Sequence, residues 1–285
     1  MKPFSVRRQQ LRDLVASGGT TAALGASDAL SAKLIAAAGF PCVYVGSYAT
    51  AASRFGLPDT GLLSLPDMVE QARTIADAVE LPLIADAEGG FNDAANIWRT
   101  VRDFERAGVS AIHIEDHAFG KHADVPQRLH DKEDAANRIR AAVDARSDPN
   151  FLIIARSDAA WVTGDVDETV SRLNAYAEAG ADMVFPTMLA PPKLKEIRAS
   201  LSRPVMVVDT PGYALAAEAE AGASIVLYYG FSLMAQYRAV RDAARRFRET
   251  GDADAIDGLR GEAAALEAFI GYAEFAARSR KYGPR

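Results

Sequence analysis

The sequence is poor in the residues that build disulfides and zinc sites. It has one cysteine, Cys42, and 4 histidines among 285 residues. A single cysteine excludes an internal disulfide framework, and without clustered Cys or His ligands a zinc site is disfavoured. Cys42 precedes the apolar run Val43-Tyr44-Val45, so we expect a buried, inert thiol.

Long apolar runs and excess positive charge are also missing. No segment approaches the length that spans a membrane, and the first fifteen residues, MKPFSVRRQQLRDLV, lack the apolar centre of a signal peptide. The 32 basic residues are outnumbered by 38 acidic ones, for a net charge of −6. Neither nucleic acid nor a membrane surface is an expected partner, and we expect a cytoplasmic protein.

One stretch, residues 81–90 (LPLIADAEGG), joins an apolar run to two acids. Its run Leu83-Ile84-Ala85 predicts a strand that is buried on both faces, and Asp86 and Glu88 follow directly. Alternate residues of a strand point to the same side, so both carboxylates can converge on one cation. The pattern recurs at residues 111–116 (AIHIED) and, in weaker form, at 151–158 (FLIIARSD).

Apolar runs alternate with helical patterns along most of the chain. An Ala-Gly pair, as in Ala107-Gly108, recurs where helices lead into strands, and glycine there suits a helix C-cap. The repeat predicts an α/β fold, a (β/α)8 TIM-type barrel over residues 1–250. The alternative, an open doubly wound sheet, lacks a G-x-G-x-x-G after its first strand. The predicted strands are 20–26, 42–47, 83–88, 111–116, 151–158, 183–187, 205–210 and 224–230.

Two segments do not follow this alternation of strands and helices. Residues 117–131 form a polar stretch that is long for a barrel loop, and such loops are usually functional or mobile. Residues 251–285 continue with an apolar helical pattern that includes Leu259, Leu266 and Phe269. We expect this C-terminal helical extension to pack on a partner subunit, in a homo-oligomer that is a dimer or tetramer.

Acids gather at the C-terminal ends of the predicted strands, where a barrel carries its chemistry. They include Asp59, Asp86, Glu88 and Glu115. The sequence suggests no lysine near them, so the carboxylates would repel one another unless a hard divalent cation binds them. Oxygen ligands favour Mg²⁺, with Mn²⁺ as the alternative.

Three other polar residues at these strands have ordinary structural interpretations. Asp116 and Asp158 follow strands directly, and an acid in that position often caps the next helix. His113 lies within the apolar strand Ile112–Ile114, so a packed, hydrogen-bonded core histidine is expected.

Arg156 emerges from an apolar strand among these acids. Its guanidinium could clamp a substrate carboxylate through two hydrogen bonds, or it could form an ion pair with Glu115 or Glu88. Gly46 and Ser47 end the second strand, and their backbone N–H groups and the hydroxyl could bind a carboxylate or oxyanion.

Six short motifs occur in a fixed order: YVGS (44–47), GLPD (56–59), ADAEGGF (85–91), HIED (113–116), IARSDA (154–159) and AGAD (179–182). Together they resemble the isocitrate lyase / phosphoenolpyruvate mutase superfamily, over about residues 20–250. The resemblance implies a (β/α)8 barrel, a bound Mg²⁺ with a 2-oxo carboxylate or its enolate on it, and tetramers that exchange a C-terminal helix.

The resemblance also assigns roles by position. Asp86 is expected to bind the metal directly, while the ion's waters are held by Asp59, Glu88 and Glu115. The residues expected to bind the small carboxylic acid substrate are Tyr44, Gly46, Ser47, Asp59 and Arg156.

The chain departs from the family in the segment after the fourth strand. The lyases carry a catalytic Cys there, in a Lys-Arg-Cys-Gly-His run. This chain reads Lys121-His122-Ala123-Asp124-Val125, with neither that Cys nor the Asn of the phosphonate mutases. Lys121, His122 or Asp124 is then the candidate proton donor, and His122 is best matched to neutral pH.

Three further departures concern substrate size. Glu88 stands where the family usually has Asp, Thr187 stands where tricarboxylate lyases have Glu, and Val208-Asp209-Thr210 replaces Asn-x-Thr-Glu. These differences argue against isocitrate or methylisocitrate as the substrate, and they leave the metal-binding half of the site in place.

The main hypothesis is a Mg²⁺-dependent lyase that cleaves a carbon–carbon bond of a small 2-oxo or 2-hydroxy carboxylic acid. Retro-aldol cleavage or decarboxylation would pass through a pyruvate-like enolate held by the metal and Arg156. Decarboxylation best tolerates the missing Cys. The alternatives are a phosphonate C–P mutase or hydrolase, and a barrel that binds a carboxylate without turning it over.

Overall fold

The computed structural model describes residues 2–256 and 258–284. Its described part contains a parallel eight-stranded sheet in the order β8-β7-β4-β3-β2-β1-β10-β9. Every strand of this sheet lies inside a range predicted from the sequence. The strands are β1 (Thr21–Gly25), β2 (Val43–Val45), β3 (Leu83–Asp86), β4 (Ala111–Glu115), β7 (Leu152–Ser157), β8 (Met183–Pro186), β9 (Met206–Val208) and β10 (Ile225–Tyr228).

The sheet closes into a ring that is nearly complete. Its two end strands, β8 and β9, meet at one isolated parallel bridge between Val184 and Val205. By contrast, β4 and β7 pair in register from Ala111↔Leu152 to Glu115↔Arg156. The predicted (β/α)8 TIM-type barrel is therefore confirmed.

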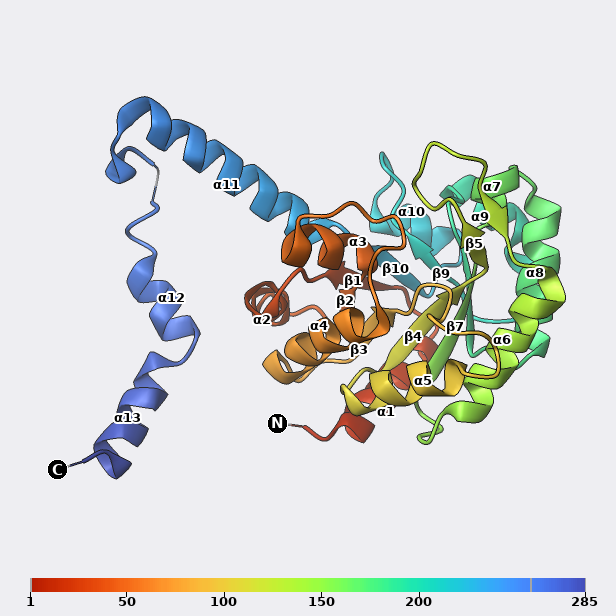
Figure 1. Cartoon of the computed structure of the whole chain (residues 1–285), viewed down its shortest axis with the longest axis horizontal. Helices are drawn as coiled ribbons and strands as arrows, with labels where there is room; N and C mark the ends of the chain where they lie inside the picture. The colour runs from red at the N-terminus through yellow and green to blue at the C-terminus, as the bar shows by residue number, and fades with distance from the viewer. Residues whose placement is uncertain (1, 257, 285) are drawn as a thin grey trace. The chain divides into compact units, whose positions relative to one another are not determined.

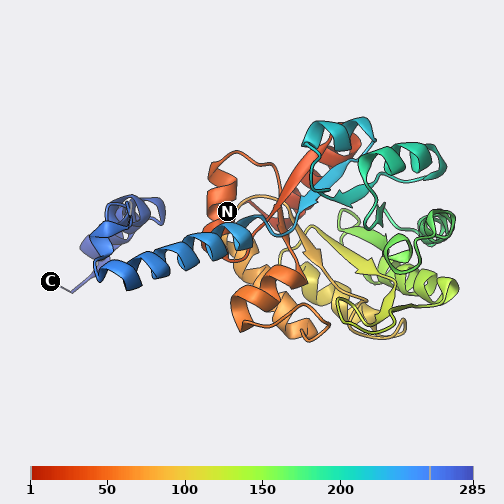
Figure 2. The ribbon, with the colours of Figure 1, turned by 90° about the horizontal axis from the view of Figure 1, so that it is seen from above.

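Helices follow the strands and cover the outside of the ring, as α4, α5, α6 and α8 do in Figures 1 and 2. Ser64 and Asp67 form a reciprocal capping box at the start of α4, with Pro66 in its first turn. Met68 and Ile75 on the same face of α4 are fully buried against the barrel. The helices after the strands are α2 (Ala29–Ala37), α3 (Ser47–Thr50), η1 (Ala51–Phe55), α4 (Leu65–Ala78), α5 (Ile97–Arg106), α6 (Lys132–Ala145), α7 (Ala159–Thr163), α8 (Val166–Glu178), α9 (Pro191–Ile197), η2 (Arg198–Ser200), α10 (Leu215–Glu220) and α11 (Phe231–Thr250).

The first helix, α1 (Phe4–Ala16), packs on the interior of the barrel. Leu11 is fully buried in the cluster of side chains that fills the ring. Arg7 and Arg8 donate hydrogen bonds to the backbone oxygens of Ala76 and Val109, which fixes the helix to the barrel. Cys42 lies in the same interior cluster, and burial raises the pKa of its thiol to about 12, as expected of an inert thiol.

The polar stretch 117–131 contains a short antiparallel hairpin that the sequence analysis did not predict. Its strands are β5 (His117–Phe119) and β6 (Arg128–Leu129). His130 N–H donates to the backbone oxygen of Asp116, which ties the base of the hairpin to the end of β4. We call residues 117–131 the lid hairpin.

By compactness the chain forms two units, Met1–Leu233 and Met234–Arg285. After α11, the second unit contains η3 (Ala253–Ala255), α12 (Ala263–Phe269) and α13 (Tyr272–Tyr282). Neither α12 nor α13, all of whose residues are described, has a buried residue. The extra C-terminal helices are thus present, whereas the division at residue 250 and the packing on a partner stay predictions. Across the described residues, no helix has the length and apolar character needed to cross a membrane.

Candidate active site

A cavity of about 300 Å³ opens at the C-terminal ends of the barrel strands, a volume at the lower end of small-molecule sites. Glu88 and Glu115 line an adjoining cavity that shares Lys121 with the first. Asp124, the remaining predicted site residue, lines neither cavity. The predicted residues that line the first cavity are Tyr44, Gly46, Ser47, Asp59, Asp86, Lys121, His122 and Arg156.

Three carboxylates converge beside this cavity. Asp86, Glu88 and Glu115 are buried, and one oxygen from each lies within 4.8 Å of the others. The register of β3 on β4 pairs Asp86 with His113, which places Glu115 at the same edge of the sheet. Glu88 adopts a φ of 48°, a backbone conformation that is uncommon outside glycine and often found at functional sites. Such a cluster can hold a metal ion.

Lys121 reaches into this cluster from the lid hairpin. Its Nζ lies 2.6 Å from Glu88 Oε2, 3.2 Å from Glu115 Oε1 and 3.9 Å from Asp59 Oδ2. The expectation that no lysine lies near the acids is therefore wrong. The lid hairpin brings Lys121 back over the ends of β3 and β4, a contact that no local pattern in the sequence encodes.

The charges of the cluster are strongly coupled. Burial raises the pKa of Glu88 to about 8, helped by the Asp86 carboxylate, while Lys121 acts in the opposite direction. Burial also opposes ionisation of Asp86, but His113 and Lys121 outweigh it and hold the pKa of Asp86 below its usual range. Lys121 and Arg156 supply two positive charges against the four carboxylates of Asp59, Asp86, Glu88 and Glu115, so the acids remain short of positive charge.

Two buried oxygens in the cluster also lack partners within the described residues. Glu88 Oε1 and Asp59 Oδ1 accept no hydrogen bond, although an unpaired buried acceptor is costly. The oxygen donor set, the excess negative charge and these orphaned atoms all fit a bound hard cation.

Asp86 is held in place by three donors from two strand ends. Ser47 donates to Asp86 Oδ2 from its hydroxyl at 3.0 Å and its backbone N–H at 3.3 Å, and Glu88 N–H donates to Oδ1 at 2.8 Å. Gly46 must lack a side chain because a Cβ there would come within 2.8 Å of the Tyr44 ring. Ser47 thus binds the Asp86 carboxylate, and its contact with substrate stays a prediction.

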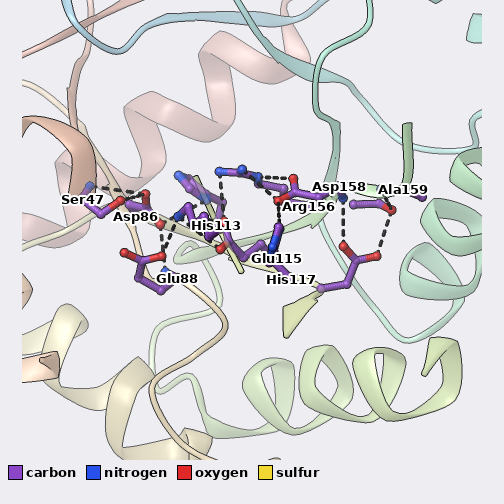
Figure 3. Close-up of polar contacts among 12 residues, drawn as sticks. Ser47, Asp86, Glu88, His113, Glu115, His117, Arg156, Asp158 and Ala159 are labelled. Carbon is purple, nitrogen blue, oxygen red and sulfur yellow. Dashed lines mark hydrogen bonds and ion pairs between the residues drawn. The ribbon is translucent and has the colours of Figure 1, made fainter. Parts of the chain in front are cut away.

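Arg156 forms two ion pairs at the end of β7, shown in Figure 3. Its Nη1 lies 3.0 Å from Glu115 Oε2, and its Nε and Nη2 donate to the two oxygens of Asp158 at 2.7 and 3.0 Å. Asp158 is therefore a partner of Arg156, and its interpretation as a helix cap is wrong, since it makes no side-chain cap to α7. The guanidinium is held with its remaining N–H groups available to a ligand.

Asp116 is a structural anchor behind the site. It accepts hydrogen bonds from the backbone N–H of Asp158, the Ser157 hydroxyl and the Tyr176 hydroxyl, at 2.8 to 2.9 Å. The helix-cap interpretation of Asp116 is also wrong, because its partners come from β7 and α8. This network fixes the end of β7, and no sequence motif marked Tyr176 as a participant.

His113 is the buried, packed histidine that the sequence predicts. Its Nε2 lies 3.0 Å from the Tyr44 hydroxyl, and its ring packs edge-on against Phe185. Burial lowers the pKa of His113 to about 4. The imidazole is therefore neutral at physiological pH and forms part of the floor of the cavity.

His122, on the lid hairpin, also lines the cavity. In contrast to Lys121, it forms no close ion pair with a described residue. Its ring packs on Trp161, with centroids 4.9 Å apart, and its Nε2 lies 3.6 Å from Asp59 Oδ2. Like Glu88, it has a positive φ, 55°. Burial lowers the pKa of its imidazole.

Comparison with known proteins identifies the family. The family model described as phosphoenolpyruvate phosphomutase matches residues 11–248. The chain belongs to this family. The predicted membership of the isocitrate lyase / phosphoenolpyruvate mutase superfamily is thereby confirmed.

Relatives of this phosphomutase-family chain include lyases. The 2,3-dimethylmalate lyase of Eubacterium barkeri is 40% identical over 220 residues, covering 76% of this chain and 73% of that protein. The oxaloacetate decarboxylase of Bradyrhizobium diazoefficiens is 31% identical over 263 residues, covering 90% of each. A solved structure of phosphonopyruvate hydrolase in complex with oxalate and Mg²⁺ has a TM-score of 0.89 at 31% identity, covering 97% of this chain and 99% of that one. At the level of reaction class, the predicted carbon–carbon lyase is confirmed.

The phosphomutase-family barrel also presents a set of cavity residues that the sequence analysis missed. They are apolar or aromatic and follow β2, β7, β8 and β10. Large apolar residues after a strand resemble ordinary core, so their position at the strand ends was the one available signal. The residues are Tyr48, Trp161, Met188 and Tyr229.

Proposed function

We propose that the chain is a Mg²⁺-dependent lyase that cleaves a carbon–carbon bond of a small 2-oxo or 2-hydroxy carboxylic acid. The observation that carries the proposal is the buried convergence of Asp86, Glu88 and Glu115 beside Arg156. Relatives named 2,3-dimethylmalate lyase and oxaloacetate decarboxylase support it. So does a related structure that holds oxalate and Mg²⁺.

The residues present suit this ion. Asp86 would bind it directly, and Asp59, Glu88 and Glu115 would hold its waters. Mn²⁺ prefers the same ligands. When bound, the ion supplies Lewis-acid stabilisation of negative charge that develops on a substrate oxygen.

The chain itself would supply binding, orientation and a proton. Arg156, held by Asp158 and Glu115, would bind the substrate carboxylate with its remaining N–H groups. Tyr44, Gly46, Ser47 and Asp59 line the same space. The lid hairpin would exclude water from the reacting atoms.

Among the lid residues, His122 is the best placed proton donor. Lys121 is engaged by Glu88 and Glu115, Asp124 lies outside the cavity, and Ala123 carries no ionisable group. His122 lines the cavity and can exchange a proton near neutral pH.

A screen of 2-oxo and 2-hydroxy acids with and without Mg²⁺ tests the function. We expect Mg²⁺-dependent release of pyruvate or a homologue from at least one compound, and loss of that release with EDTA. Binding without turnover across the screen would favour a non-catalytic carboxylate-binding barrel. Phosphonopyruvate belongs in the same screen, because phosphate release from it would replace C–C with C–P cleavage.

We also propose that the protein is a homo-oligomer in which the C-terminal helices pack on a partner subunit. The support is the absence of buried residues in α12 and α13, together with exposed aromatic side chains such as Phe275 and Tyr282. Light scattering should report a dimer or tetramer for the full chain and a smaller species after truncation at residue 250. The cytoplasmic location expected from the sequence stays a prediction.

A further inference from the structure

All 4 histidines of the chain lie between positions 113 and 130, on β4 and the lid hairpin. His113 lies on the floor of the cavity, His122 lines the cavity, and His130 is partly exposed at the end of the hairpin. His117, the remaining one, takes no part in the reaction proposed above. Its side chain is only 2% exposed, and a buried imidazole is costly unless its N–H is bonded. The partner of that N–H therefore indicates what His117 does.

The imidazole of His117 bonds to Asp158, the carboxylate that holds Arg156. Its Nδ1 lies 3.1 Å from Asp158 Oδ2, the oxygen that also accepts from Arg156 Nη2 at 3.0 Å. Burial opposes ionisation of Asp158, but the Arg156 guanidinium and the bond from His117 outweigh it and hold the pKa of Asp158 below its usual range. An ionised carboxylate only accepts hydrogen bonds, so Nδ1 carries the proton and donates it. Figure 3 shows the three side chains together.

The orientation of Arg156 depends on this carboxylate. Two acids share the guanidinium, since its Nη1 lies 3.0 Å from Glu115 Oε2 and its Nε lies 2.7 Å from Asp158 Oδ1. If the Asp158 carboxylate turned about its own side-chain bonds, the guanidinium would turn with it or be drawn towards Glu115. The bond from His117 to Oδ2 opposes this turn. Partners of this kind orient the group that touches a ligand, and small misplacements of such a group are costly.

His117 acts from outside the space that a substrate would occupy. It is not among the described residues that line the first cavity, whereas it does line the adjoining one. Its ring packs on Trp161, with centroids 5.4 Å apart, and it is the first residue of β5. The base of the lid hairpin is therefore fastened to Asp158 by a side chain, in addition to the backbone bond from His130 to Asp116.

We infer that His117 is a positioning residue, which holds Asp158 and thereby fixes the guanidinium of Arg156 for the substrate carboxylate. The same bond ties the first strand of the lid hairpin to that guanidinium. The inference rests on the proposed lyase function, because it takes Arg156 as the group that binds the carboxylate. It adds to the site a residue that neither touches the substrate nor transfers a proton.

Two substitutions separate the hydrogen bond of His117 from the packing of its ring. His117→Phe keeps a ring against Trp161 and removes the N–H. His117→Asn removes the ring and keeps an N–H, because Nδ2 of asparagine lies as many bonds from Cβ as Nδ1 of histidine does. Calorimetry with oxalate in MgCl₂ measures the effect. We expect the affinity to fall by about tenfold in His117→Phe, as is typical for the loss of an orienting partner, and to stay near the wild-type value in His117→Asn.

The order of the two variants decides the inference. A loss in His117→Asn that equals or exceeds the loss in His117→Phe overturns it, because packing of the ring would then be the role of the residue. Unchanged affinity in His117→Phe overturns it as well. Thermal midpoints check the fold, and His117→Leu, which also lacks the N–H, replaces His117→Phe if the larger ring prevents folding.

A double-mutant cycle tests whether His117 acts through Arg156. In an Arg156→Lys background the planar fork is already gone, so the addition of His117→Phe should weaken oxalate binding little further. A general structural defect would instead lower the affinity by the same factor in both backgrounds, and that result overturns the inference.

His130→Phe is the matched control. His130 lies on the same hairpin and lines the same adjoining cavity, but it bonds to Asp116 and Arg172 through its backbone. This variant should bind oxalate like wild type, and a loss equal to that of His117→Phe overturns the inference, because it would come from the hairpin in general. Wild-type protein that fails to bind oxalate in MgCl₂ rejects the proposed function itself. Wild-type binding with unaltered affinity in the His117 variants rejects only the inference.

Discussion

The cavity has a metal side, which includes Asp59, Asp86 and Arg156, and an apolar side, which consists of Tyr48, Met188, Val208 and Tyr229. The residues of the two sides are held in very different ways. Asp86 accepts three hydrogen bonds from Ser47 and Glu88, and it is nearly inaccessible to solvent. On the apolar side, Met188 is 67% exposed and Tyr229 is 38% exposed. The chemistry is thus built from preorganised groups, whereas the surface that meets the variable part of a substrate is loosely held.

The largest expected effect comes from removing the centre of the metal side. In Asp86→Ala, Mg²⁺ binding should be lost and activity should fall by about a thousandfold, the size of losing a major electrostatic stabiliser. Calorimetry with MgCl₂ measures the affinity, and the thermal midpoint checks the fold. A variant that binds Mg²⁺ like wild type would show that Asp86 is not the ligand.

A smaller loss is expected at the lid hairpin, where the two sides meet. His122→Ala should lower kcat by about a hundredfold with little change in KM, because a proton donor acts in the transition state. Asp124→Ala is the matched control, two residues away and outside the cavity, and should keep wild-type kcat. Equal kcat values in the two variants would remove His122 from the mechanism.

A tenfold effect on KM is expected when Arg156 is replaced by lysine, which keeps the positive charge but not the planar guanidinium. Lysine cannot reproduce the planar fork that binds Asp158 through Nε and Nη2. We expect Arg156→Lys to raise KM by about tenfold or more, with the change confirmed by weaker oxalate inhibition. Unchanged kinetics would make Arg156 a purely structural residue.

The smallest expected effect is on the stability of the fold, and it concerns His113 on the floor of the cavity. The pKa of His113 is about 4 in the folded chain, below the value near 6.5 of an unfolded histidine. Between these pH values the unfolded chain binds the additional proton, so this contribution to stability falls as the pH is lowered. From pH 6.5 to 5, wild type should lose about 2 kcal/mol more than His113→Gln. Urea unfolding in EDTA at both pH values measures the difference, and parallel losses would contradict the buried neutral imidazole.

Much of the barrel could be read from local patterns, because each strand is an apolar run and each helix carries a periodic face. Segments without such patterns were missed. The lid hairpin pairs His117 with Leu129 and Phe119 with Arg128, with no alternating apolar pattern to mark either strand. The helical segment 47–55 is rich in small residues and has no apolar stripe. Their structure depends on the surrounding barrel.

The same distinction applies to the residues of the candidate site. Asp86, Glu115 and Arg156 could be placed from sequence because they follow apolar strands whose ends share one edge. The contact of Lys121 with Glu88 and the bond from Tyr176 to Asp116 could not, because each joins segments that only the closed barrel brings together. Long-range pairing of this kind leaves no trace in spacing or composition.

The bridge between Val184 and Val205 has a consequence for how this barrel can be redesigned. It joins β8 and β9 at one residue pair, whereas β4 and β7 are paired along five residue pairs. A bulkier side chain next to this seam should be accommodated by a slight shift of β9, because β8 is paired with β7 at Arg156 and Phe185. Directed evolution for wider substrates should therefore accumulate its changes along β8 and β9.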